Sequence, residues 1–205
     1  MLLDTDLSGL LGITLAIVAL LNSFQRVRAL PLLRRAAANV AAIVVVSIPL
    51  WGVSAAAFMR GMTGDLSITT LLLLALALLH SFTGKPLVAD GNRFALLRAI
   101  SIAAILFYPL ALGLGMFDPY RLGYGSLWFM IPLLGLAVWS GLRYSTLLSF
   151  CIALAVAAWS AGWYESPNLW DYLLDPWLAV YAFIVTSKFA LARWRGRKNA
   201  QAEPQ

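Results

Sequence analysis

The sequence predicts an all-α fold: a polytopic transmembrane helical bundle of about seven spans, with its N-terminus outside and its C-terminus in the cytoplasm. Hydrophobic residues make up 61% of the 205 and charged residues only 12%, whereas about a quarter of the residues in a soluble domain are charged. The apolar runs are also continuous, as in Leu71–Leu79. A membrane β-barrel would instead show short segments of alternating polarity. We therefore predict an integral membrane protein of the helical class.

A spanning helix needs about 20 mostly apolar residues, and the chain holds seven candidate segments. The fifth is the shortest, and it either crosses fully, forms a tight hairpin with the sixth through residues 141–144, or re-enters without crossing. In chain order the candidates are Leu7–Phe24, Ala36–Phe58, Leu66–Phe82, Ala95–Met116, Leu127–Ser140, Thr146–Trp163 and Trp177–Arg193.

Basic residues predict the orientation, because loops rich in Lys and Arg stay in the cytoplasm. The first connector, QRVRALPLLRR, carries four arginines, so we place it inside. Alternation then leaves only Arg60 and Arg121 of the 15 basic residues outside. The acids have the opposite bias, which together with the size of the chain indicates the inner (plasma) membrane of a bacterium. The acids expected outside are Asp4, Asp6, Asp65, Asp118, Glu165, Asp171 and Asp175.

The domain organisation expected from these spans is simple. Residues 1–193 form a single transmembrane helical domain, and residues 194–205 form a short basic and polar cytoplasmic tail. The start, MLLDTDLSGLL, is acidic and lacks the positive n-region of a cleaved signal peptide, so we expect no cleavage.

Several kinds of site are excluded or disfavoured by residue counts. A single cysteine, Cys151, excludes an intrachain disulfide, and the lone His80 cannot form a multi-histidine haem or zinc site. We expect no cofactor and no metal. The basic residues lie at the ends of apolar runs, so membrane orientation explains them and nucleic acid is not expected. Arg98 and Lys188 lie near the predicted cytoplasmic ends of their spans and are interpreted as anchors.

Two patterns predict an outward-facing pocket. Pro49, Pro109 and Pro132 fall in the outer halves of three predicted spans, where proline kinks would spread the helices. Tryptophans and tyrosines gather on the same side, where they form either an interfacial belt or, since the inner side has far fewer, the lining of a groove. The tyrosines are Tyr108, Tyr120, Tyr124, Tyr164, Tyr172 and Tyr181. The tryptophans in the outer half or at its border are Trp51, Trp128, Trp159, Trp163, Trp170 and Trp177.

The outer connectors contain helix-start signals that account for many of the acids. Asp118-Pro119 predicts the start of a turn, and Asp175-Pro176 predicts the N-cap of the last span. Asp65 is expected to cap the third span. Asn168 is expected to cap a short amphipathic helix lying on the outer leaflet.

The sequence is compatible with three functions. The favoured one is a non-catalytic membrane module, an accessory subunit or small carrier, whose outer aromatic pocket binds an amphiphile, a membrane lipid or another membrane protein. The alternatives are an enzyme acting on a lipid-linked substrate at the outer leaflet and an ion-coupled transporter, the latter disfavoured by the lack of mid-membrane charge. The candidate catalytic residues are Asp118, Glu165 and Asp171, and the candidate ligand-binding residues are Arg121, Asp65, Tyr120, Tyr124, Trp128, Trp163 and Trp170.

Overall fold

The fold is all-α, as predicted. The computed structural model describes residues 5–50, 52–143 and 145–202. These residues form ten α-helices, one short 3₁₀ helix and a β-hairpin with two residues in each strand. Helix accounts for 77% of the structure. Asp4, Trp51 and Tyr144 lie outside the described residues, as does the side chain of Asp6.

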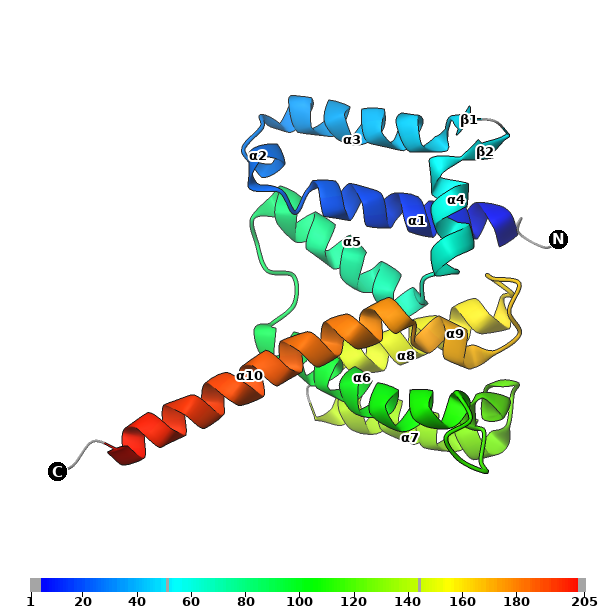
Figure 1. Cartoon of the computed structure of the whole chain (residues 1–205), viewed down its shortest axis with the longest axis vertical. Helices are drawn as coiled ribbons and strands as arrows, with labels where there is room; N and C mark the ends of the chain where they lie inside the picture. The colour runs from blue at the N-terminus through cyan, green and yellow to red at the C-terminus, as the bar shows by residue number, and fades with distance from the viewer. Residues whose placement is uncertain (1–4, 51, 144, 203–205) are drawn as a thin grey trace.

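Seven of the helices are long, and each overlaps one of the seven predicted segments (Figure 1). The helix that corresponds to the third predicted segment is capped by Ser67, whose side-chain oxygen accepts from the Thr70 amide at 3.2 Å. The last continues through the basic residues that were expected to form a separate tail. The seven are α1 (Thr5–Leu21), α3 (Leu32–Ser47), α5 (Ile68–Thr83), α6 (Asp90–Ala111), α7 (Leu127–Leu142), α8 (Thr146–Ser160) and α10 (Pro176–Ala202).

The predicted second segment is wrong as a single helix. Helix α3 ends at Ser47, and Ile48 is extended because the ring of Pro49 disfavours a helical residue before it. A hairpin follows, in which β1 (Pro49–Leu50) pairs antiparallel with β2 (Val53–Ser54) before α4 (Ala55–Thr63). Proline 49 therefore ends a helix instead of kinking one, whereas Pro109 and Pro132 do lie inside α6 and α7.

One helix among the described residues, α6, is by itself long and apolar enough to cross a membrane. Four shorter apolar helices accompany it, at Leu7–Leu21, Ile68–Thr83, Leu127–Leu142 and Thr146–Ser160. The seven-span arrangement therefore stays a prediction.

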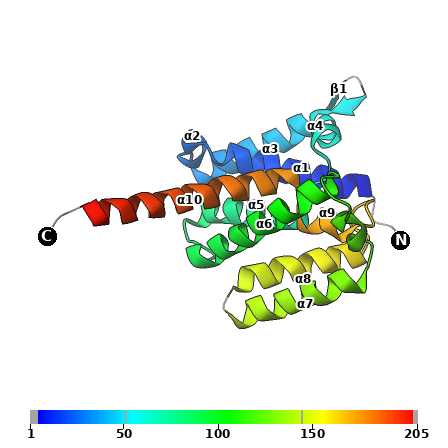
Figure 2. The ribbon, with the colours of Figure 1, turned by 60° about the horizontal axis from the view of Figure 1, so that its bottom comes forward.

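The helices pack as two groups joined through α5. Helices α1, α3 and α4 pack together, and α1 packs against α5. Helix α6 packs along α10, and α7 packs along α8. Contacts from α5 to α8 join the groups. Figure 2 shows α7 and α8 as a pair on one side of α6 and α10, with α1 and α3 on the other. Apolar side chains such as Ile102, Ile131 and Ile184 remain exposed on the outer surfaces of the long helices.

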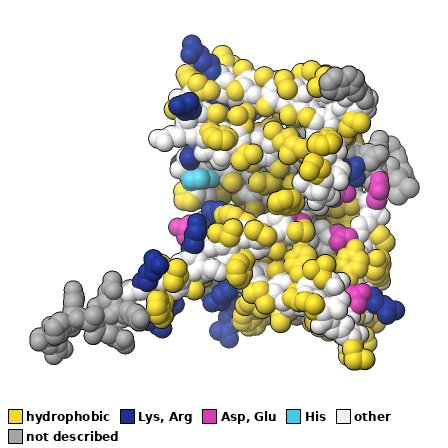
Figure 3. Space-filling view, viewed as in Figure 1, with side chains coloured by type: hydrophobic (Ala, Val, Ile, Leu, Met, Phe, Trp, Pro, Cys, Tyr) yellow, Lys and Arg dark blue, Asp and Glu magenta, His cyan; other side chains and the backbone are white. Residues whose placement is uncertain are grey.

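Charge is separated along the length of the helices. Lys and Arg gather at one end, and most Asp and Glu lie at the other (Figure 3). We term these the basic end (Arg28, Arg35, Arg93), where α5 ends and α6 begins, and the acidic end (Asp65, Asp118, Asp171, Asp175), where α5 and α10 begin.

A buried arginine joins three helices at the basic end. Arg35 of α3 is only 5% exposed, although the sequence places it in a solvated connector. Its Nε donates to Asn22 Oδ1 at 2.6 Å, and its Nη1 donates to the Ser81 carbonyl at 2.7 Å. The guanidinium lies 4.0 Å from the ring centroid of Phe82. Asn22 also donates to Asn39 Oδ1 at 2.7 Å, so this polar contact ties α1 and α3 to the end of α5.

Candidate functional site

Two short helices close the acidic end. The 3₁₀ helix η1 (Pro119–Gly123) begins at Asp118, whose Oδ1 accepts from the Tyr120 amide at 2.9 Å. Helix α9 (Leu169–Leu173) begins at Asn168, whose Oδ1 accepts from the Trp170 amide at 3.0 Å. Both caps confirm the local sequence signals.

Helix α9 does not lie on the surface as expected. Leu169 and Tyr172 are fully buried, because α9 packs against α5, α8 and η1. Asn168 Nδ2 donates to the Tyr120 carbonyl at 2.8 Å. Gly123 and Asn168 approach each other so closely that a Cβ on Gly123 would lie 1.8 Å from Asn168 Oδ1. The two short helices therefore form one packed unit that covers this end of the bundle.

Asp175 joins the first turns of α5 and α10. It is 4% exposed, and its Oδ1 caps α10 by accepting from the Leu178 amide at 2.8 Å. Its Oδ2 accepts from the Ser67 amide at 3.0 Å, from Ser67 Oγ at 2.7 Å and from Thr70 Oγ1. The cap of α5 is thus Ser67, and the expectation that Asp65 would cap it is wrong. Asp65 instead forms an ion pair with Arg60, with 2.6 Å between Oδ1 and Nε.

A cavity of about 460 Å³ lies at this end, between the start of α5, the end of α6, η1 and α9. We term it the acidic cavity. Aromatic and carboxyl side chains together dominate its lining. The aromatic members are Phe107, Tyr108, Tyr120, Tyr164 and Trp170, and the acids are Asp65, Asp118, Asp171 and Asp175.

Two tyrosines in the lining are fixed as hydrogen-bond donors. The Tyr120 hydroxyl donates to Asp171 Oδ2 at 2.9 Å, and Ser166 Oγ donates to the same oxygen. Burial and this hydrogen bond raise the pKa of the Tyr120 phenol. The Tyr164 hydroxyl donates to the Leu66 carbonyl at 2.7 Å, and burial followed by the charge of Asp65 raises its pKa. Both phenols therefore stay protonated at neutral pH.

An apolar cavity of about 230 Å³ adjoins the acidic cavity. It lies among α6, α7 and α8, and Phe129, Pro132 and Leu133 of α7 form one of its walls. Both cavities are lined by Trp170 and Leu174. The Trp170 ring packs between Phe107 and Phe129, at 4.4 Å between centroids in each case. The site therefore has a charged compartment and a hydrocarbon-lined one that share Trp170 and Leu174 as walls.

The structure separates the candidate residues into three groups. Asp65, Asp118, Tyr120, Trp170 and Asp171 line the acidic cavity. Glu165 lies beside it, in a groove that it shares with Arg60 and Asp65. The remaining candidates, like Glu165, line neither cavity. Arg121, Tyr124 and Trp128 are exposed. The buried Nε1 of Trp163 has no hydrogen-bond partner among the described residues.

Among the lining residues, Phe107 was not predicted, and Tyr108 and Tyr164 were expected only as part of the aromatic surplus on the outer side, without being candidate site residues. Phe107 and Tyr108 sit beside Pro109 near the end of α6, so the proline kink was the available signal for them. Tyr164 follows α8 directly and carried no signal beyond the general excess of aromatic residues on this side. Among the described residues, no group of three or more His, Cys, Asp or Glu side chains is arranged to hold a metal ion.

Comparison of the chain with protein-family models, with curated proteins and with solved structures gives no match. We therefore infer the function from the geometry of the two cavities.

Proposed function

We propose that this chain is an integral membrane protein with seven spans, its acidic end facing outward and its basic end facing the cytoplasm. The exposed apolar side chains along the long helices support this placement, because soluble monomers seldom leave such surfaces uncovered. The separation of charge supports the orientation, because positive residues favour the cytoplasmic side (Figure 3).

Cysteine accessibility tests this placement. The native Cys151 is 2% exposed, so it should not react with a membrane-impermeant maleimide. Tyr124→Cys places a thiol on an exposed residue at the acidic end, and Thr83→Cys places one at the basic end. In intact cells we expect Tyr124→Cys to be labelled, and Thr83→Cys to be labelled only after permeabilisation. Equal labelling of both positions in intact cells, or the reverse pattern, would contradict the orientation.

Within that membrane placement, we propose that the protein is a non-catalytic module that binds an amphiphile carrying a cationic head group. The observation that carries this proposal is the pairing of an acid-lined and aromatic cavity with an apolar cavity across Trp170. The head group occupies the acidic cavity and the hydrocarbon chain occupies the apolar one. The outer-leaflet enzyme and the ion-coupled transporter stay untested predictions.

The charge of the lining favours a cation. Four carboxyl groups face the acidic cavity, and of these only Asp65 has an ion pair with a described base. Aromatic faces attract ammonium groups through cation–π contacts, which contribute about 0.5–2 kcal/mol each. An anionic head group would instead be repelled by the same carboxylates. Arg121, predicted to contact an anion, does not line this cavity.

The hydrogen bonds of the acids favour binding over catalysis. Asp118 holds the first turn of η1, Asp171 holds Tyr120 and Ser166, and Asp175 holds the helix starts. Each carboxylate therefore has a positioning role, which suits a preformed binding surface.

Calorimetric titration of the protein in lipid nanodiscs tests the proposal. The probes are dodecyltrimethylammonium and the neutral dodecyl maltoside, which has the same chain length, and empty nanodiscs serve as the blank. We expect the cationic probe to bind about tenfold more tightly than the neutral one, from one to two favourable charge contacts. Asp171→Asn should remove most of this preference.

Glu165→Gln is the matched control, because it removes a negative charge from the same end without changing the lining of the acidic cavity. This variant should retain the preference for the cationic probe. Equal binding of the two probes to the wild type would overturn the proposed function. An unchanged preference in Asp171→Asn would do the same.

A further inference from the structure

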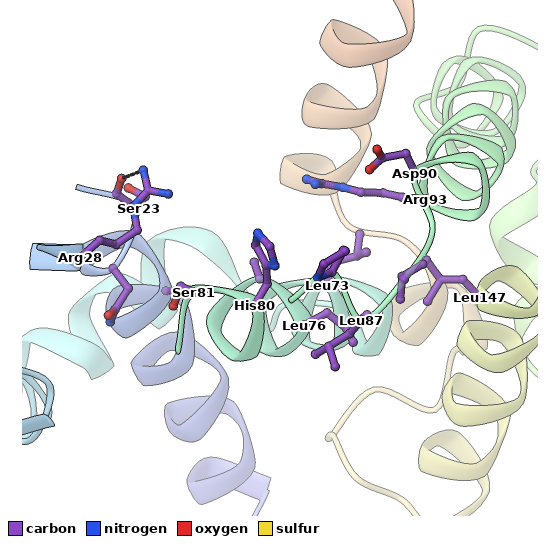
Figure 4. Close-up of a pocket in the computed structure, with 15 residues that line it drawn as sticks. Ser23, Arg28, Leu73, Leu76, His80, Ser81, Leu87, Asp90, Arg93 and Leu147 are labelled. Carbon is purple, nitrogen blue, oxygen red and sulfur yellow. Dashed lines mark hydrogen bonds between the residues drawn. The ribbon is translucent and has the colours of Figure 1, made fainter. Parts of the chain in front are cut away.

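Another cavity with both polar and apolar lining lies at the basic end, away from the acidic cavity. Figure 4 shows the residues that line it. Its volume is about 320 Å³, and we term it the basic cavity. The first turns of α5 and α10 are tied together by Asp175, and Figure 1 shows the two helices diverging from there toward the basic end. The chain from Gly84 to Ala89 crosses between α5 and α6 at this point.

Basic side chains are prominent in the polar part of the basic cavity. Arg28, His80 and Arg93 line it, together with one acid, Asp90. In Figure 4, Arg28 and Arg93 lie on either side of His80, and Arg93 extends over the space above α5. Two arginines from distant parts of the chain therefore face one opening.

Neither arginine is neutralised by a described carboxylate. Arg28 donates one bond to the Ser23 carbonyl at 3.2 Å, and Arg93 donates one to the Tyr181 hydroxyl at 2.6 Å. A guanidinium has five N–H donors, so each retains donors for a ligand. Asp90 makes no ion pair with either of them. The two positive charges at the opening thus have no salt-bridge partner among the described residues, although Asp90 lines the same cavity.

The floor of the basic cavity is apolar. Leu73, Leu76 and Leu87 form part of it (Figure 4). A neighbouring cavity of about 550 Å³ is also lined by Leu76 and Leu87, and it extends along α8 to Phe150 and Ala153. An acyl chain that entered beneath the arginines would therefore contact apolar side chains that line both cavities.

We propose that the basic cavity binds a phospholipid of net negative charge, with its anionic head group between Arg28 and Arg93 and an acyl chain along the apolar floor. Guanidinium groups bind phosphate oxygens through paired hydrogen bonds, and basic pockets between helices on the cytoplasmic side attract anionic head groups. The inference rests on the proposed membrane orientation. It does not depend on the ligand of the acidic cavity, which has the opposite charge and lies at the other end.

Binding of fluorescent phospholipids to the full-length protein in detergent tests the proposal. The probes are phosphatidylglycerol and phosphatidylcholine with identical acyl chains. We expect wild-type protein to bind phosphatidylglycerol about tenfold more tightly, because the two arginines favour the lipid whose head group carries a net negative charge. The double variant Arg28→Gln/Arg93→Gln should bind the two lipids within about twofold of each other.

Three controls make the result specific. Arg98→Gln removes an exposed charge of α6 that does not line the cavity, so it should retain the preference. Tyr181→Phe removes the partner of Arg93 but leaves its charge, and it should also retain the preference. Arg28→Lys/Arg93→Lys keeps both charges and should retain a measurable part of it.

Two results would overturn the proposal. One is equal affinity of the wild type for the two lipids, and the other is an undiminished preference in the folded double glutamine variant. Displacement of phosphatidylglycerol by millimolar inorganic phosphate would also contradict it, because the site would then recognise a free anion without needing the chain. Cationic-probe binding at the acidic cavity should be unchanged in the double variant, so the two proposals fail separately.

Discussion

Asp175→Ala is expected to lower the melting temperature of the purified protein by about 6–12 °C. The side chain is 4% exposed and accepts from Ser67, Thr70 and Leu178. Its removal leaves several buried donors at two helix starts without an acceptor, at a cost of about 3 kcal/mol in the free energy of unfolding. A loss of that size corresponds to the stated shift for a chain of about 200 residues.

Fluorescence-detected size-exclusion chromatography after heating measures this shift. Asp175→Asn keeps one carbonyl oxygen and should fall between the wild type and the alanine variant. Asp118→Ala is the matched control, because Asp118 caps only the short helix η1 through one bond, and we expect it to cost about 1 kcal/mol or less. If Asp175→Ala melted within about 2 °C of the wild type, Asp175 would not join α5 to α10 as described.

Arg35→Ala is expected to destabilise the basic end by about 3 kcal/mol. The substitution removes the donors that Asn22 Oδ1 and the Ser81 carbonyl accept from. Asn22 is itself 2% exposed. Water can therefore replace the lost donor only if the side chains packed around Asn22 move apart. The same thermal assay should show a loss comparable to that of Asp175→Ala.

Arg35→Lys separates geometry from charge. The guanidinium contacts its partners through three different nitrogen atoms, which one ammonium group cannot reproduce. We therefore expect the lysine variant to recover less than half of the loss. Arg34→Ala removes the exposed neighbouring arginine and should change stability by about 0.5 kcal/mol or less. Full recovery by lysine would show that the positive charge alone stabilises this contact.

Local sequence signals predicted the helix starts at the acidic end well. Asp118, Asn168 and Asp175 each cap the helix that follows them, because capping involves residues two or three positions apart. The long helices were predicted from continuous apolar runs for the same reason. Each of these features is determined within one or two helical turns.

Features set by distant residues were predicted poorly. The sequence around Arg35 resembles a solvated connector, and its burial depends on Ser81, 46 positions further along the chain. Helix α9 has an amphipathic pattern that suits a membrane surface, yet η1 and α8 cover it. Ser67 and Asp65 both suit an N-cap, and the choice between them depends on Asp175. The sequence therefore predicted on which side of the molecule the acidic cavity lies and some of the residues that line it, but not the complete lining.

Photo-crosslinking within the two adjoining cavities tests the central claim most directly. The probe is a trimethylammonium amphiphile with a diazirine at the end of its hydrocarbon chain, applied to the protein in lipid nanodiscs. Because the head group is proposed to lie in the acidic cavity, mass spectrometry should locate the crosslinks on walls of the apolar cavity, such as Phe129, Leu133 and Ile152. Asp171→Asn should reduce them. Crosslinks confined to exposed residues such as Ile105 and Leu106 would contradict the claim.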